Sequence, residues 1–220
     1  MKNAVIIVAG GIGSRMGSHV PKQFLLINNK PVLMHTIKKF IDFDENIDII
    51  ITLPENQIQT WKNLCIKYDF RHNHTIIKGG ITRFHSVRNA LEKISENYKI
   101  IAVHDGVRPL INGETIRKCF DLATEKGNAV PVIQINESIR RIRENTSEIV
   151  NRDEIYIVQT PQIFAQDIIK QAYKQNYIPE FTDDASVVEK SGITINFIEG
   201  HRENIKITFP ADIVFAERFV

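Results

Sequence analysis

The alternation of short runs rich in Ile and Val with longer segments of helical spacing constrains the fold of this chain most strongly. The apolar runs, each predicted to be a strand buried on both faces, are residues 4–9, 47–53, 75–77, 100–103 and 129–135. The helical segments between them are residues 31–43, 58–68, 83–94 and 114–126. This alternation predicts an α/β, Rossmann-like domain: a mostly parallel twisted sheet with helices on both faces.

The pattern changes after residue 135. Short alternating stretches such as SIRRIR and EIYIVQT follow, joined by the polar ENTSE. They predict an extended β-arm over residues 137–160, protruding from a single domain that spans residues 1–220. The remaining elements are predicted as helices over residues 166–174 and 183–191 and from residue 210, and as strands over residues 194–198 and 205–208.

Charge and composition exclude several classes of function. Lys and Arg number 28 against 26 Asp and Glu, so the chain lacks the basic excess of a general nucleic-acid binder. Cys65 and Cys119 stand far apart and do not make a disulfide framework, which favours a reducing cytoplasm. The N-terminal apolar run breaks at Gly10, too early for a membrane span, and it lacks a signal-peptide pattern. We therefore expect neither nucleic acid nor a membrane as a partner.

A glycine-rich loop, AGGIGSRMG, follows the first predicted strand. Gly10, Gly11 and Gly13 allow a tight turn that brings backbone N–H groups to an anion, although a plain strand-to-helix turn is the alternative. The spacing misses the dinucleotide pattern G-x-G-x-x-G by one residue, and no acidic residue follows about 20 positions later. A nicotinamide oxidoreductase is therefore disfavoured. No Lys-Ser/Thr pair follows either, so the loop is not a P-loop.

Two cations accompany this loop. Arg15 lies within it and Lys22 lies in the PKQF stretch that follows. Each alone is explained equally well as solvated surface charge. Together with the glycines they suit a triphosphate, because its charge is concentrated in one place.

The strand predicted over residues 100–103 leads into AVHDGVRPL, where Asp105 and Arg108 flank Gly106. A carboxylate at a strand end can take a metal ion or a ribose hydroxyl, and Arg108 can hold a phosphate with two nitrogens. The alternative is a structural ion pair that closes a loop. Lys206, in ENIKIT, is similarly either a site cation or an ordinary edge-strand charge.

Three other features carry weaker signals. FTDDAS, residues 181–186, is typical of a capped helix start, with Thr182 or Asp183 as the cap. His72 and His74 lack a third ligand at metal-binding spacing, so a solvated loop is favoured. Neither cysteine has a His or Asp beside it that would indicate a thiolate nucleophile.

Six blocks, in this order and across almost the whole chain, resemble the 2-C-methyl-D-erythritol 4-phosphate cytidylyltransferases: AGGIGSRMGSHVPKQF, GGITRFHSV, VHDGVRPL, VQTPQIF, FTDDASVVE and EGHRENIKIT. The resemblance implies a nucleotidyltransferase of non-mevalonate isoprenoid biosynthesis. Such an enzyme joins CTP to a sugar-alcohol phosphate, giving 4-diphosphocytidyl-2-C-methyl-D-erythritol and pyrophosphate, with magnesium. It also implies a homodimer in which the arm of residues 137–160 clasps a second subunit.

The resemblance further implies roles for individual residues. The catalytic cations would be Arg15 and Lys22. The nucleotide-binding residues would be Ala9, Gly10, Gly11, Gly13, Gly79, Gly80, Arg83, Ser86, Asp105 and Gly106. The residues that bind the second substrate would be Asp105, Arg108, Ser138, Arg152, Thr160 and Lys206, with Arg152 reaching the sugar phosphate in the neighbouring subunit. Asp105 would also be a metal ligand.

Two departures and two alternatives qualify this resemblance. NESIR replaces the usual Asp-Thr pair before the arm, so Ser138 is assigned the role of that threonine. Gly10 stands where many members have alanine, and it also occurs in ribitol-5-phosphate cytidylyltransferases of wall teichoic acid synthesis, which share GGIGSRMG and PKQF. RFHSV and TDDASVVE are closer to the methylerythritol enzymes. A non-catalytic nucleotide-binding module is the second alternative, although it would not need a second phosphate pocket.

Overall fold

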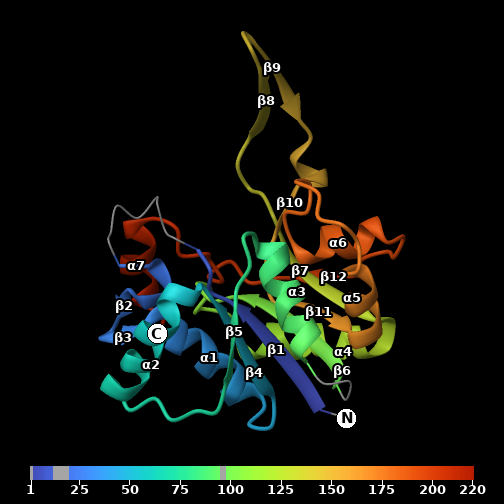
Figure 1. The fold of residues 1–220 in the computed structure, drawn as a ribbon. Coiled ribbons are helices and arrows are strands. Elements are labelled where there is room, and N and C mark those ends of the chain that lie inside the picture. Colours follow the sequence, from blue (N-terminus) through green and yellow to red (C-terminus); the bar gives the residue numbers. More distant parts are fainter. Residues whose placement is uncertain (1, 12–19, 95–97) are drawn as a thin grey trace.

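The computed structural model describes residues 2–11, 20–94 and 98–220 (Figure 1). Its largest sheet contains β1 (Lys2–Val8), β4 (Asp48–Leu53), β5 (Thr75–Lys78), β6 (Tyr98–Asp105), β7 (Asn128–Gln134), β10 (Tyr156–Val158), β11 (Gln162–Ala165) and β12 (Phe197–Glu199). The strands lie in the order β10-β7-β11-β6-β1-β4-β5, and β12 also pairs with β7. Strands β4, β1 and β6 run parallel, with Thr52, Val8 and Asp105 side by side at their carboxyl ends.

Helices cover both faces of this sheet, as predicted. One face is covered by α1 (Val32–Phe43), α2 (Glu55–Lys67) and α4 (Gly113–Lys126), and the other by α3 (Arg83–Lys93), α5 (Gln166–Ala172) and α6 (Asp184–Lys190). Along β1, Val5 and Ile7 pack into the first core and Ala4 and Ile6 into the second, all fully buried. Because each fully buried Ile contributes about 1.5–3 kcal/mol, this central strand anchors both layers.

Capping residues and glycine set the ends of helix α4. Asn112 accepts a hydrogen bond from the backbone N–H of Thr115 at the start of α4, and Gly127 ends that helix in the left-handed region at φ 86°, as its place after Lys126 predicts. Helix α2 begins directly after Pro54, earlier than the predicted residue 58. The last helix is α7 (Pro210–Ala216). None of the helices in the described ranges combines the length and apolar character needed to cross a membrane.

Two predictions about the sheet are wrong. β5 is an edge strand whose residues are all exposed or half-buried, so it is not buried on both faces. Residues 205–208 form no strand; instead the N–H of Ile207 donates to the carbonyl of Val107 at 2.9 Å. The sequence predicts no strand order; in the structure β11 lies between β6 and β7, antiparallel to both. The insertion was not foreseen because β11 follows the segment predicted as an arm.

That segment contains a hairpin of β8 (Ile139–Arg143) and β9 (Thr146–Val150), which forms a two-stranded sheet of its own. Figure 1 shows the hairpin standing away from the main sheet. The 3-10 helix η3 (Arg152–Glu154) and β10 lead the chain back. The small pair β2 (Leu26–Ile27) and β3 (Lys30–Pro31) and the 3-10 helix η2 (Lys22–Phe24) complete the described elements. Dimerisation through residues 137–160 stays a prediction.

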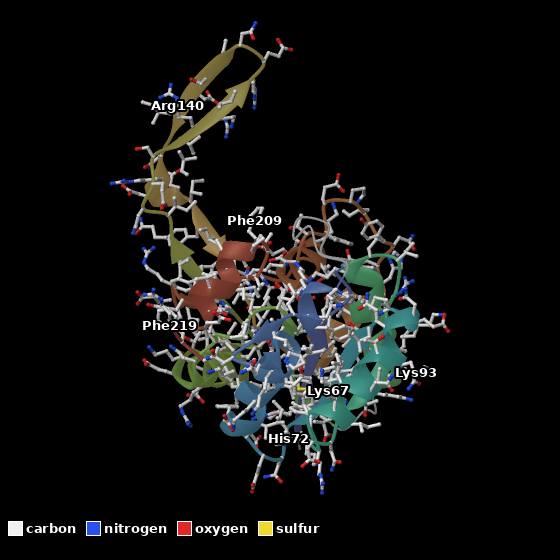
Figure 2. The ribbon with its side chains drawn as sticks, turned by 90° about the vertical axis from the view of Figure 1, so that its left-hand side faces the viewer. Lys67, His72, Lys93, Arg140, Phe209 and Phe219 are labelled. Carbon is white, nitrogen blue, oxygen red and sulfur yellow. The ribbon has the colours of Figure 1, made fainter. Side chains whose placement is uncertain are left out.

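The pair His72 and His74 has a structural role. His72 lies at the end of the molecule opposite to Arg140 of the hairpin (Figure 2). The indole N–H of Trp61, which is fully buried on α2, donates to Nε2 of His74 at 3.0 Å. Nδ1 of His74 therefore carries the proton and donates to the carbonyl of His72 at 2.7 Å. Within the described ranges, no group of three or more His, Cys, Asp or Glu side chains could hold a metal ion.

Acid should weaken this contact. Burial lowers the pKa of His74 below 6.5, against the opposing effect of the His72 carbonyl. A lowered pKa in the folded state means that the contribution of His74 to stability is present above about pH 6.5 and is lost as the pH falls below it. Because Trp61 is the only tryptophan, its fluorescence should change in that window, with a loss of about 0.5–1.5 kcal/mol. His74→Gln, which keeps an acceptor without titrating, should remove this change; an identical titration in the variant would contradict the assignment.

Candidate functional site

A cavity of about 240 Å³ lies beyond the carboxyl ends of β1 and β6. Its lining comes from segments far apart in the sequence: Ala9, Gly10, Gly11, Lys22, Gln23, Gly80, Ile81, Thr82, Arg83, Ser86, Asp105, Val107 and Lys206 are among them. The edge formed by the carboxyl ends of parallel strands is where ligands bind in open α/β sheets. The register of β1 and β6 brings Val8 beside Asp105, so the two loops that follow must meet at this edge.

A second cavity of about 210 Å³ adjoins the first. It is lined by Arg108, Val158, Gln159, Thr160, Gln162, Thr182 and Asp183 together with three residues that also line the first cavity. The shared residues are Arg83, Asp105 and Lys206, which we call the shared wall. Two compartments separated by charged side chains can hold two ligands against each other.

Three cations surround the carboxylate of Asp105. Lys206 Nζ lies 2.9 Å from Oδ2 and Arg108 Nε lies 3.3 Å from the same oxygen. Arg83 Nε lies 3.6 Å from Oδ1. Burial by itself would raise the pKa of Asp105, but the attraction of Lys206, Arg83 and Arg108 outweighs it and holds that pKa far below its usual range. Asp105 is therefore ionised throughout the physiological range and holds the cations together.

A chain of hydrogen bonds fixes the end of β6. The N–H of Asp105 donates to Oγ1 of Thr160 at 3.0 Å, and that hydroxyl donates to Nδ1 of His104 at 3.0 Å. Nε2 of His104 then carries its proton and donates to the carbonyl of Arg108 at 3.1 Å. Burial lowers the pKa of His104 to about 4, so this ring is neutral at pH 7. Since both its nitrogens are engaged, His104 supports the site and is unsuited to be a general base.

The loop that carries Lys206 is held by polar groups that the sequence interpretation missed. Nη1 of Arg108 donates to the carbonyl of Asn204 at 2.8 Å, and Nδ2 of Asn204 donates to the carbonyl of Thr160 at 2.9 Å. Nε2 of Gln159 donates to the carbonyl of His201 at 2.8 Å. Neither amide stands in a pattern that marks it as special, since its partners lie 42 or more positions away.

At the side of the first cavity that is lined by the start of α3, this helix holds a glycine pair in place. The hydroxyl of Ser86 accepts from the N–H of Gly80 at 3.0 Å and donates to the carbonyl of Thr82 at 3.0 Å. Thr82 caps α3 by accepting from the N–H of His85. A Cβ on Gly79 would lie 3.2 Å from the Ser86 hydroxyl, so both glycines permit the close approach of the loop to the helix.

The structure brings most of the predicted site residues together. Those that line one or both cavities are Ala9, Gly10, Gly11, Lys22, Gly80, Arg83, Ser86, Asp105, Arg108, Thr160 and Lys206. Gly79 lies against Ser86, and Gly106 donates its N–H to the carbonyl of Val8 at 2.9 Å, packed where a Cβ would meet Ala9. Ser138 and Arg152 line neither cavity; Arg152 Nη1 donates to the carbonyl of Asn136 at 2.7 Å, at the base of the hairpin. Gly13 and Arg15 lie outside the described residues.

Comparisons with known proteins agree on one family. A sequence profile of 2-C-methyl-D-erythritol 4-phosphate cytidylyltransferase matches residues 3–220. A protein of that name from Bacteroides thetaiotaomicron is 49% identical over 213 residues, 97% of each chain. The crystal structure of 2-C-methyl-D-erythritol 4-phosphate cytidylyltransferase from Francisella tularensis is similar with a TM-score of 0.83 at 29% identity, covering 100% of both chains. The enzyme of that name from Thermus thermophilus gives a TM-score of 0.81 at 27% identity, covering 99% of this chain and 98% of the other.

The glycine at position 80 should be essential to the packing of the site. A Cβ there would overlap the side chain of His85 and lie 2.8 Å from its carbonyl carbon, so the start of α3 would have to move. We expect Gly80→Ala to lower the free energy of unfolding by about 1–3 kcal/mol. The matched control is Gly113→Ala, at the start of α4, where nothing lies within 4 Å; it should be neutral or stabilise by up to about 1 kcal/mol. Urea unfolding measures both, and equal midpoints for the two variants would contradict this packing argument.

Proposed function

The chain belongs to the 2-C-methyl-D-erythritol 4-phosphate cytidylyltransferase family, and on that premise we propose how its residues carry out the reaction. The enzyme transfers the cytidylyl group of CTP to 2-C-methyl-D-erythritol 4-phosphate, giving 4-diphosphocytidyl-2-C-methyl-D-erythritol and pyrophosphate in isoprenoid biosynthesis. The observation that supports our assignment of residues is the pair of adjoining cavities with the shared wall of Arg83, Asp105 and Lys206.

The larger cavity takes CTP. Its floor is formed by backbone of Ala9, Gly10 and Gly11, which can approach phosphate oxygens closely, and Lys22 stands beside Gly11. The smaller cavity takes the methylerythritol phosphate, with Arg108 and Lys206 as the cations for its phosphate. Between them Asp105 can accept hydrogen bonds from hydroxyls of either sugar. The two reacting phosphates then meet at the shared wall.

The chemistry needs no general base. A phosphate monoester has its second pKa near about 6, so its oxygen is already largely ionised at pH 7. One such oxygen attacks the α-phosphorus of CTP in line with the leaving group, a new P–O bond forms, and the bond to pyrophosphate breaks. The protein's task is to bring two anions together that would otherwise repel, which explains why the site is built from cations.

Among the residues that the structure describes, Lys22 is the one proposed to stabilise the transition state. It is largely buried in η2, at the lip of the first cavity next to Gly11. Its ammonium group can neutralise charge that builds up on the α-phosphate and on the departing pyrophosphate. Arg15 is proposed to act beside it, from the part of the glycine loop that lies outside the described residues.

Magnesium is the proposed cofactor, and the donor set fits it. Among the described residues that line the first cavity, Asp105 is the one carboxylate; Lys206 and Arg108 contact its Oδ2, while Arg83 Nε lies 3.6 Å from its Oδ1. Mg²⁺ is commonly held by one or two carboxylates with substrate phosphates and water. Asp105 Oδ1 would supply that single protein ligand. When bound, the ion would neutralise charge on the CTP phosphates.

We also propose that the enzyme acts as a homodimer through residues 137–160. In the hairpin β8–β9, the side chains of Ile142 and Ile149 are 73% and 80% exposed, which favours a partner on this segment. Arg152 and Ser138 lie at its base, away from both cavities of their own chain, and would complete the sugar-phosphate site of the other subunit.

A cytoplasmic location is also proposed. Both cysteines are free thiols, which supports it.

The reaction is tested by pyrophosphate release with CTP and magnesium. Wild-type enzyme should release pyrophosphate with methylerythritol phosphate and far more slowly with ribitol 5-phosphate. Lys22→Ala should lower turnover roughly 10²–10³-fold, because a preorganised charge at the transition state is lost. Lys118→Ala, which removes an exposed lysine paired with Glu114 on α4, serves as the control and should leave turnover unchanged. A loss under threefold in Lys22→Ala would remove Lys22 from the mechanism, and a preference for ribitol 5-phosphate would reject the substrate.

Sharing of the site between subunits is tested by mixing inactive variants. Arg152→Ala should lose activity because the neighbouring site lacks its phosphate contact, and Lys22→Ala should lose it within its own site. In a mixed dimer, one of the two sites contains neither substitution, so part of the activity should return after subunit exchange. If mixtures stay as inactive as the separate variants while sedimentation shows mixed dimers, Arg152 acts within its own chain or not at all.

A further inference from the structure

The FTDDAS segment contains two adjacent carboxylates with different surroundings. Asp183 is the cap of α6: its Oδ1 accepts the N–H of Ser186 at 2.9 Å. Asp184, the next residue, is fully buried and takes no part in the cap. Its Oδ1 and Oδ2 accept from Nη1 and Nη2 of Arg83 at 2.8 and 2.6 Å, and Oδ1 also accepts the hydroxyl of Tyr173 at 2.6 Å. The capping explanation of this segment therefore leaves Asp184 without an assigned role.

Arg83 connects this buried carboxylate to the site. Its two terminal nitrogens face Asp184, while its Nε faces Oδ1 of Asp105 at 3.6 Å. One guanidinium thus spans a carboxylate inside the core and a carboxylate in the shared wall. Burial of Arg83 would lower its pKa, but Asp184 and Asp105 together raise that pKa above its usual range, so the cation is permanent. Tyr173, itself stacked on Phe84 and buried, holds the far side of Asp184.

The buried pair of Asp184 and Arg83 destabilises the core relative to apolar side chains, so packing alone does not explain its presence. Taking a carboxylate and a guanidinium out of water is unfavourable, and apolar side chains of similar volume often stabilise a core as well or better. Asp184 instead accepts hydrogen bonds from both terminal nitrogens of Arg83 and from the hydroxyl of Tyr173, and together these contacts hold Arg83 in one orientation. A bidentate pair supported by a third donor fixes the plane of the guanidinium as well as its position.

We propose that Asp184 and Tyr173 are positioning residues that fix Arg83 in the wall between the two cavities, so that the two phosphates meet in the reactive geometry. This inference rests on the proposed function. With Asp184 neutral, Arg83 would keep Asp105 as its nearest carboxylate and would turn its terminal nitrogens toward it. It would then approach the oxygen that Lys206 and Arg108 contact, and its guanidinium would leave its place in the shared wall.

The first test is a double-mutant cycle between Asp184→Asn and Arg83→Gln. Asp184→Asn should lower kcat at least about tenfold, since small misplacements at a reacting centre have effects of that order. The KM values should change less than about threefold, because the glycine loop, Lys22 and Lys206 remain. If Asp184 acts through Arg83, the double variant should have a kcat within about threefold of Arg83→Gln alone. Losses that multiply would overturn the proposal.

Loss of folded enzyme must be separated from loss of positioning. Calorimetric titration with CTP gives the fraction of competent sites in each variant, and kcat is expressed per competent site. The double variant should also unfold at a higher temperature than Asp184→Asn, because removing the guanidinium leaves no unpaired buried charge. If kcat per competent site in Asp184→Asn equals that of wild type, the residue is only structural and the proposal fails.

Tyr173→Phe provides a milder variant with a matched control elsewhere in the chain. The hydroxyl of Tyr98 donates to Oδ2 of Asp48 at 2.6 Å, the same bond type and length, at the amino end of β6. Both substitutions remove one hydrogen bond to a carboxylate, but Tyr173→Phe should lower stability more, because Tyr173 and Asp184 are buried while Tyr98 and Asp48 are half-buried; kcat is therefore again expressed per competent site. We expect Tyr173→Phe to lower kcat about threefold and Tyr98→Phe to leave it unchanged; equal kcat values in the two variants would overturn the role of Tyr173. Failure of the wild-type enzyme itself to release pyrophosphate would reject the proposed function instead.

Discussion

The site depends on one buried carboxylate and the three cations gathered around it. Without Asp105, the side chains of Arg83, Arg108 and Lys206 would repel one another at short range. Without the cations, a carboxylate with 9% of its side chain exposed would be strongly destabilised as an anion. The carboxylate and the three cations therefore stabilise one another. Because the cations come from the start of α3, the turn after β6 and the loop before α7, the same interaction also ties three parts of the fold together.

The sheet supplies the alignment on which this interaction relies. Val8, Thr52 and Asp105 end parallel strands side by side, so the loops that follow β1 and β6 emerge at one edge. The hydroxyl of Thr160 then accepts the N–H of Asp105. Insertion of β11 beside β6 is what delivers Thr160 to that point. The antiparallel strand that interrupts the parallel order is thus also the one that completes the second cavity.

Two carboxylates contact different nitrogens of Arg83. Asp184 lies in the core and engages both terminal nitrogens, whereas Asp105 lies in the shared wall and engages Nε. Proposed in this way, the site places fixed cations where two phosphate esters must approach each other, and it needs no titrating base. The neutral, fully engaged ring of His104 agrees with such chemistry, which depends on placement and charge rather than on proton transfer by the protein.

The sequence by itself determined the alternation of strands and helices, the double burial of β1, the stop at Gly127 and many of the residues that line the cavities, because these follow from local spacing or from ordered sequence blocks. Only the tertiary structure decided that β11 separates β6 from β7, that residues 205–208 form no strand, and that Asn204 and Asp184 hold Arg108 and Arg83. Arg83 and Asp184 are 101 positions apart. A pairing over that distance leaves no periodic signal along the chain, since it exists only after both cores have packed.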